Sequence, residues 1–147
     1  MWIKDIRSQI TKIKQSSYYE GDFGDTISDR SLLLNEITSN NTEHLNDYHE
    51  FMQSIGFGEL DESFYMEDGP THYQKLFDRE IIDLKGMYIF ASDQSEYSYA
   101  FDSKNNFEVV DISASGILGK NHGCFKTFIM KKITEVENMT IWREENL

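Results

Sequence analysis

The sequence predicts an α+β fold in which helices pack against an antiparallel sheet, and two patterns carry this prediction. Residues 87–102, MYIFASDQSEYSYAFD, indicate two strands joined by a polar turn: residues 87–91 are apolar throughout, and residues 97–101 alternate with the period of a strand. Residues 107–112, FEVVDI, follow after a short polar link and complete an antiparallel meander. Apolar residues at helical spacing lie on both sides of this meander and predict the helices.

Two helices are predicted near the start of the chain. Four isoleucines at spacings of three and four place an amphipathic helix at residues 2–15: Ile3, Ile6, Ile10 and Ile13. Residues 16–29 indicate an irregular segment or a short edge strand. Ser28 and Asp29 favour a helix start near Arg30, since their side chains cap free backbone N–H groups. This second helix is expected to carry Leu32, Leu33, Leu34 and Ile37, and the polar residues 39–42 interrupt it.

A third helix and a short strand are predicted before the meander. Thr42 is the expected cap of a helix that Gly56 ends, and its apolar stripe holds Leu45, Tyr48, Phe51, Met52 and Ile55. Gly58 follows closely, so the chain should turn sharply into extended structure. Residues 64–66 form a short strand that residues 67–70 close with the chain's only proline. Residues 71–83 are predicted to be a helical or irregular connection.

A loop and a last helix are predicted after the meander. Residues 113–123 contain three glycines and indicate a loop with a short strand at residues 116–118. The last helix has an apolar stripe of Phe125, Phe128, Ile129, Ile133 and Val136. Residues 138–147 then form a polar tail, whose Trp142 should dock on the body because a large aromatic side chain is costly to leave in water. Cys124 is expected to pack beside Phe125.

Composition restricts the class of protein. A chain of 147 residues fits one domain. Its net charge of −12, from 14 basic and 26 acidic residues, argues against a nucleic-acid partner and favours a basic protein, although the same charge also serves solubility. A single cysteine, no signal-peptide pattern and no apolar run of about 20 residues predict a cytoplasmic protein without membrane association.

The sequence contains no motif for catalysis, a cofactor or a metal ion. HExxH, CxxC, GxSxG and phosphate-binding glycine loops are absent. His44 and His49 are five residues apart and fall on different sides of a helix, which indicates surface or capping histidines. Two acidic clusters, Asp93 with Glu96 and Glu59 with Asp61 and Glu62, fit solvated loop charges. A small hydrolase built on these carboxylates is a remoter alternative, since such catalysis depends on their separation in space.

Three segments of the chain together resemble a known family. Residues 46–60, NDYHEFMQSIGFGEL, join a tyrosine-bearing helix to a glycine-flanked turn, residues 87–102 form a hairpin that ends in aspartate, and residues 125–129, FKTFI, open the last helix. Their order and spacing resemble the SUKH superfamily of Smi/Knr-type proteins, which includes fungal regulators of glucan synthesis and bacterial immunity proteins. The chain departs from the family pattern at residues 45–46, where a Leu-Pro pair is usual, and at residues 93–96, where glycines are usual.

The resemblance implies one Smi/Knr-type domain over residues 1–147, with about six mostly antiparallel strands and helices packed against them. It also implies a non-enzymatic, intracellular immunity protein that binds and neutralises a cognate toxin, often a nuclease. A regulatory scaffold for cell-wall or glucan synthesis is the alternative. For a basic toxin, we expect the interface at the loop edge of the sheet, where carboxylates and one aromatic side chain gather: Glu59, Asp61, Glu62, Asp68, Asp93, Glu96 and Tyr97.

Overall fold

A six-stranded antiparallel sheet, with its strands in chain order from β1 to β6, is the centre of the fold. The computed structural model describes residues 1–39 and 41–147. With helices packed against this sheet, the protein has the predicted α+β fold. The strands are β1 (Gly58–Asp61), β2 (Phe64–His72), β3 (Met87–Ser92), β4 (Tyr97–Asp102), β5 (Glu108–Ser113) and β6 (Leu118–Gly123).

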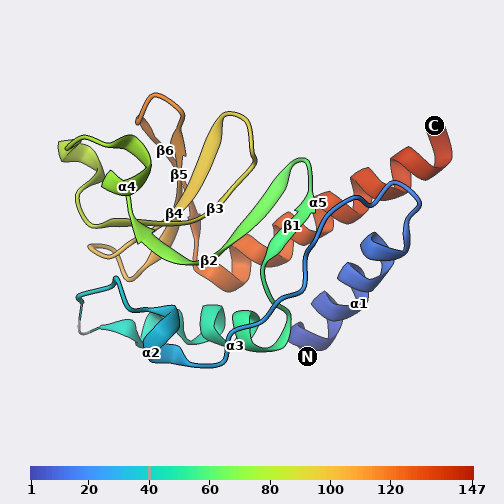
Figure 1. Cartoon of the computed structure of the whole chain (residues 1–147), viewed down its shortest axis with the longest axis horizontal. Helices are drawn as coiled ribbons and strands as arrows, with labels where there is room; N and C mark the ends of the chain where they lie inside the picture. The colour runs from blue at the N-terminus through green and yellow to red at the C-terminus, as the bar shows by residue number, and fades with distance from the viewer. Residues whose placement is uncertain (40) are drawn as a thin grey trace.

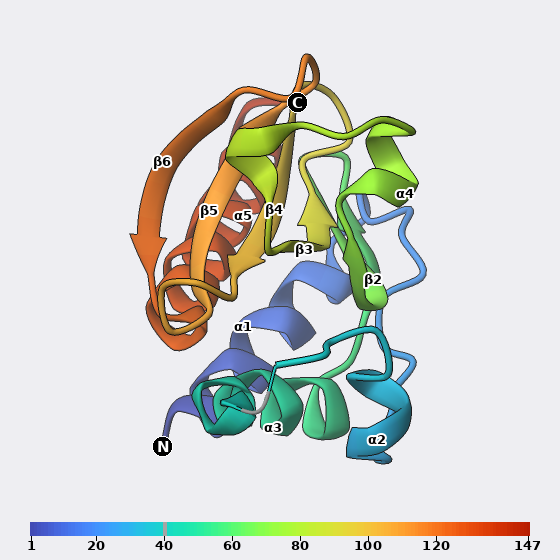
Figure 2. The ribbon, with the colours of Figure 1, turned by 90° about the vertical axis from the view of Figure 1, so that its left-hand side faces the viewer.

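Helices cover both faces of this sheet. Figure 1 shows α4 and α5 on opposite sides of the central strands, and Figure 2 shows the same layers after a quarter turn. The helix α1 lies beside α5, where Gln9 donates to Thr134 and Glu137. The helical segments are α1 (Trp2–Gln15), α2 (Arg30–Leu33), η1 (Thr42–Leu45), α3 (Asn46–Ser54), α4 (Gln74–Phe77), η2 (Ile82–Leu84) and α5 (Phe125–Asn146), of which η1 and η2 are 3-10 turns.

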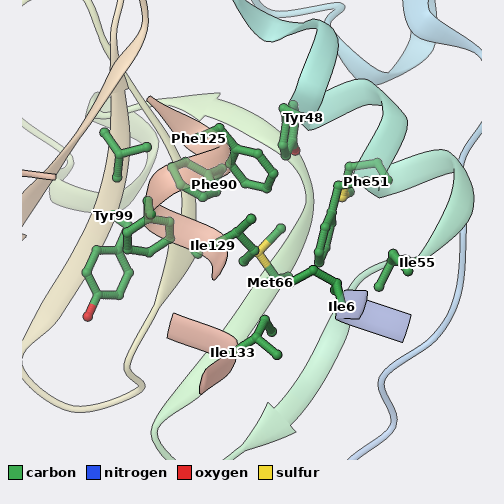
Figure 3. Close-up of a cluster of buried hydrophobic side chains, with 14 of the residues drawn as sticks. Ile6, Tyr48, Phe51, Ile55, Met66, Phe90, Tyr99, Phe125, Ile129 and Ile133 are labelled. Atoms are coloured by element: carbon green, nitrogen blue, oxygen red, sulfur yellow. The ribbon is translucent and has the colours of Figure 1, made fainter. Parts of the chain in front are cut away.

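The larger hydrophobic core lies between the sheet and helices α1, α3 and α5. Aromatic rings dominate it: Phe90 stacks on Phe101 with centroids 4.1 Å apart, and Tyr48 meets Phe101 edge-on at 4.9 Å. Figure 3 shows side chains from α3, α5 and the sheet converging on this region. Such contacts add to the free energy gained by burying the rings.

A smaller core covers the other face of the sheet, beneath α4 and η2. It consists of Tyr73, Leu84, Met87, Ile89, Ala100, Val110 and Ile112. The predicted alternation along β4 is therefore confirmed, because Tyr99 and Phe101 face the larger core while Ala100 faces the smaller one. Cover on both faces also explains why β3 is almost entirely apolar.

Several local predictions are confirmed. All four isoleucines of α1 are buried. The Asp29 carboxylate caps α2 by accepting from the backbone N–H groups of Ser31 and Leu32 at 2.9 and 3.2 Å. Gly56 follows the end of α3 with φ of +116°, a backbone conformation that glycine adopts without strain, and its N–H donates to the Phe51 carbonyl.

The predictions for the second and third helices are wrong in part. The second helix, α2, ends at Leu33, so Leu34 and Ile37 lie beyond it, and Leu32 is 58% exposed. Thr42 does not cap the next helix: it is the first residue of η1, and no side chain caps that segment. The helix α2 has only four residues, which make about one turn, so it is too short to carry the predicted apolar stripe. Of the predicted interruption at residues 39–42, Asn40 lies outside the described residues.

Two strand boundaries also differ from the predictions. The strand β2 continues through residues 67–70 to His72, with a shift in its pairing to β3 between Met66 and Thr71. Pro70 falls within that shift, where a strand tolerates a missing N–H. Residues 118–123 form the strand β6. The sequence predicted a loop over residues 113–123, with a short strand only at residues 116–118. The strand β6 is an edge strand, and exposed edges carry polar residues and glycine without an apolar alternation.

The C-terminal residues were predicted as a tail, but they extend α5 to Asn146. The buried stripe of this helix continues through Val136 to Thr140, which is 5% exposed. Trp142 does not dock on the body and is 58% exposed. Two residues beyond Thr140, it is rotated by about 200° around the helix, away from the core. Cys124 is also exposed and does not pack as an apolar residue.

No helix in the described part of the chain has the length and apolar character that crossing a membrane requires.

Candidate functional site

Two turns at one end of the sheet contact each other and bring five of the predicted interface residues together. Antiparallel pairing in chain order places the β1–β2 and β3–β4 turns at the same end. The Gln94 side chain joins them, since its amide nitrogen donates to the Asp61 carbonyl at 3.0 Å and to the Glu62 carbonyl at 3.5 Å. We call this surface the turn edge, and its predicted interface residues are Asp61, Glu62, Asp93, Glu96 and Tyr97.

Asp61 holds the turn edge to α5. Its side chain is 7% exposed, and its carboxylate accepts from Arg143 Nη1 at 2.6 Å and from the Ser63 backbone N–H at 3.0 Å. Burial by itself would raise the pKa of this carboxyl, but the hydrogen bonds from Arg143 and Ser63 outweigh it and lower the pKa. Asp61 is thus a buried, paired anion and does not present a free charge to a partner.

Asp93 organises the β3–β4 turn from within. One carboxylate oxygen accepts from the backbone N–H groups of Ser95, Glu96 and Tyr97, each at 3.0 Å. Burial alone would raise the pKa of Asp93, and the three backbone hydrogen bonds more than offset this effect and lower it. Gln94 adopts φ of +65°, the left-handed conformation that glycine favours in such turns. The Asp93 side chain thus satisfies three backbone N–H groups of the turn.

The remaining predicted residues at this edge are free to meet a partner. Glu62 and Glu96 are exposed, and Tyr97 is 43% exposed. Next to them, Glu59 lines a pocket between β1, residues 16–21 and the end of α5, together with Tyr18 and Glu20. Tyr18 and Glu20 were not predicted as interface residues. They belong to the segment predicted as irregular or as a short edge strand, and part of this segment does pair beside β1, where the Asp22 N–H donates to the Glu59 carbonyl.

Asp68 lies apart from the turn edge. It is exposed in the middle of β2 and lines a separate groove with Leu32 and Leu33 of α2. Its neighbour Glu67 has a raised pKa, first because of burial and second because of the negative charge of Asp68. The seven predicted residues therefore divide into six along one end of the sheet and one beside α2.

The histidines make isolated contacts. His49 Nε2 lies 2.9 Å from the Ser28 carbonyl, which belongs to the loop before α2, so His49 links α3 to this loop and does not cap a helix. His44 is exposed, as expected for a surface histidine. His122 pairs with Asp111 at 2.7 Å. Within residues 1–39 and 41–147, no group of three or more His, Cys, Asp or Glu side chains is placed to hold a metal ion.

Comparison of the chain with protein-family models, with curated proteins and with solved structures finds no match. The resemblance to the SUKH superfamily thus stays a prediction from the sequence motifs.

Proposed function

We propose that this chain is a non-enzymatic protein-binding module, an intracellular immunity protein of the Smi/Knr type that binds and neutralises a basic toxin. The observation that carries the proposal is the contact between the two turns. Through the hydrogen bonds of Gln94, it joins Glu62, Glu96 and Tyr97 into one exposed surface.

The chemistry of this surface suits a basic partner. Exposed carboxylates speed the approach of a cationic protein, and an exposed aromatic side chain anchors an interface once contact is made. Asp61 pairs with Arg143, so this cation at the turn edge already has an anionic partner. Asp93 accepts from the backbone N–H of Tyr97 and thus holds the backbone from which the exposed Tyr97 ring extends.

The motifs that resemble the SUKH superfamily support the same proposal by their positions. The helix α3 ends at Ser54, and a short link through Gly56 leads into β1, whose far end is the turn edge. The hairpin motif forms β3 and β4, and its turn is the part that departs from the family pattern. A turn that varies on a shared framework is where a member of such a family would acquire its own partner.

Expression with the toxin encoded beside this gene tests the proposal. The wild-type protein should co-purify with the toxin and rescue cells that express it. A Glu62→Lys/Glu96→Lys variant should lose both properties, since each substitution places a cation opposite a basic surface. Asp5→Lys/Asp83→Lys is the matched control, with the same change in charge at exposed positions outside the turn edge.

Two results would contradict the proposal. One is the absence of any complex between the wild-type protein and the neighbouring toxin. The other is full rescue by the folded Glu62→Lys/Glu96→Lys variant, with circular dichroism showing that this variant and the control retain the fold.

A further inference from the structure

A second pocket, between β6 and the first half of α5, has a charge opposite to that of the whole molecule. Three lysines line it, Lys120 from β6 and Lys131 and Lys132 from α5, and Glu135 is the only carboxylate in the lining. The chain as a whole carries a net charge of −12. Positive charge concentrated in a hollow of an acidic protein attracts small anions, because the local potential there differs in sign from that of the rest of the surface.

Two of the three ammonium groups are available to a ligand. Within the described residues, Lys120 and Lys131 form no salt bridge, and they belong to the two elements that line the pocket, β6 and α5. A compact anion between β6 and α5 could therefore accept hydrogen bonds from both lysines at once. Charge-assisted contacts from two sides distinguish a binding pocket from a scattered set of surface lysines.

The third lysine is held in place. Lys132 Nζ donates to the Tyr99 hydroxyl at 3.1 Å, pairs with Glu135 at 3.2 Å and lies 5.1 Å from the centre of the Tyr99 ring. Burial would lower the pKa of Lys132, but the contacts with Tyr99 and Glu135 outweigh burial and raise it. Lys132 thus stays cationic, but Glu135 neutralises its charge, so among the described residues the unpaired positive charge in the lining comes from Lys120 and Lys131.

His122 and an apolar floor complete the pocket. His122 Nε2 lies 2.7 Å from Asp111 Oδ2, and this contact orients the imidazole. The ring of Phe128, only 3% exposed, meets the imidazole edge-on with centroids 5.6 Å apart. A ligand that combines an anionic group with an apolar or aromatic body can place the anion between the lysines and the body over these rings.

We propose that this pocket binds the phosphoryl group of a small organic phosphate. The inference goes beyond the proposed function and does not depend on it. A phosphate monoester carries up to two negative charges and three acceptor oxygens, which matches converging lysines better than a single carboxylate does.

Titration of the isotope-labelled protein, followed by NMR, tests this site. Inorganic phosphate and phenyl phosphate are the probes, and succinate is the carboxylate comparison. Both phosphates should shift the amides of residues 120–122 and 127–132 in a saturable way. Phenyl phosphate should bind several-fold more tightly than inorganic phosphate, because its ring can pack on the partly exposed imidazole of His122. Succinate should bind more weakly than either phosphate.

Matched variants assign the binding to the lysines. Lys120→Gln/Lys131→Gln should weaken phenyl phosphate by about tenfold or more, since it removes two charge-assisted contacts. Lys85→Gln/Lys104→Gln makes the same change in charge at exposed positions elsewhere and should leave the affinity unchanged.

Three results would overturn the assignment: no saturable shift with either phosphate, equal affinity of the pocket variant and the wild-type protein, or succinate binding as tightly as phenyl phosphate. The last result would identify a carboxylate site. Because the lysines are on the surface, both double variants should keep the wild-type melting temperature, which allows a loss of binding to be separated from a loss of fold.

Discussion

At the scale of single residues, the acidic side chains of the turn edge serve two different purposes. Asp61 and Asp93 accept hydrogen bonds from within the fold, whereas Glu62 and Glu96 extend into solvent. The difference follows from side-chain length, because a short aspartate reaches backbone N–H groups two to four residues ahead in a turn. The aspartates therefore shape the surface, and the glutamates give it its charge.

Replacement of Asp61 by asparagine should destabilise the protein. The neutral amide would leave Arg143 without its anionic partner, and hydrogen bonds to charged groups contribute about 1–3 kcal/mol. We expect the free energy of unfolding, measured with urea at neutral pH, to fall by this amount. Glu62→Gln is the adjacent control and should change it by less than about 0.5 kcal/mol. Equal effects of the two substitutions would show that the Asp61–Arg143 pair contributes nothing.

The lowered pKa of Asp61 also predicts a pH dependence. Since the pKa in the folded state lies below the unfolded value of about 3.9, the contribution of Asp61 is fully present above that value. It disappears as the pH falls through the folded-state pKa. Between about pH 5 and pH 3, the unfolding free energy of Asp61→Asn should therefore fall less than that of the wild-type protein. Parallel curves, measured by urea unfolding at each pH, would contradict this assignment.

Tyr48 gives a prediction of the opposite sign. Its hydroxyl is fully buried and has no hydrogen-bond partner among the described residues. An unsatisfied buried hydroxyl costs free energy, so Tyr48→Phe should raise the unfolding free energy by about 1 kcal/mol. Tyr99→Phe, which removes an acceptor for Lys132, should instead lower it. Urea denaturation of both variants measures the contrast, and a destabilised Tyr48→Phe would refute the reasoning.

At the scale of elements, one side of α5 packs in the core and the opposite side faces solvent. Ile133 is fully buried, whereas Trp142 lies on the opposite side and is 58% exposed. Ile133→Ala should cost about 2–5 kcal/mol of unfolding free energy, and Trp142→Ala less than about 1 kcal/mol. Thermal or urea unfolding of the two variants measures this difference. A large loss for Trp142→Ala would mean that the C-terminal turns of α5 are packed more tightly than their exposure indicates.

Elements with a regular apolar period were predicted well from the sequence. The isoleucines of α1 recur at helical spacing because one face of that helix is buried. The residues of β4 alternate between large and small side chains because its two faces enter different cores. The sequence of β6 shows no apolar period, because an exposed edge strand needs only backbone pairing. The continuation of β2 through Pro70 depends on its pairing with β3, which local sequence does not encode.

The candidate site was predictable only in part, for a related reason. Polar turn residues identified residues 93–96 as exposed, but whether Asp93 meets solvent or its own backbone depends on the conformation of Gln94. The contact of Gln94 with the β1–β2 turn joins residues more than 30 positions apart. Likewise, the pocket at β6 needs lysines from a strand and a helix, and only the tertiary fold brings them together.

At the scale of the whole molecule, the net charge of −12 predicts how binding to the proposed basic toxin should depend on salt. Electrostatic steering raises association rates by about 10- to 1,000-fold at low ionic strength, and salt screens it. The rate of association with the basic toxin, measured by stopped-flow fluorescence, should thus fall by about tenfold or more as salt rises from 0.01 M to 1 M.

The dissociation rate should change far less, since charges at the rim of an interface act mainly on encounter. Asp5→Lys/Asp83→Lys and Glu62→Lys/Glu96→Lys lower the negative charge of the whole molecule equally, so any difference between them reports the position of the charges. The turn-edge variant should associate more slowly at low salt and show the flatter salt dependence. If the two variants behaved alike, net charge alone would explain the steering, and the turn edge would not be the surface that the toxin approaches.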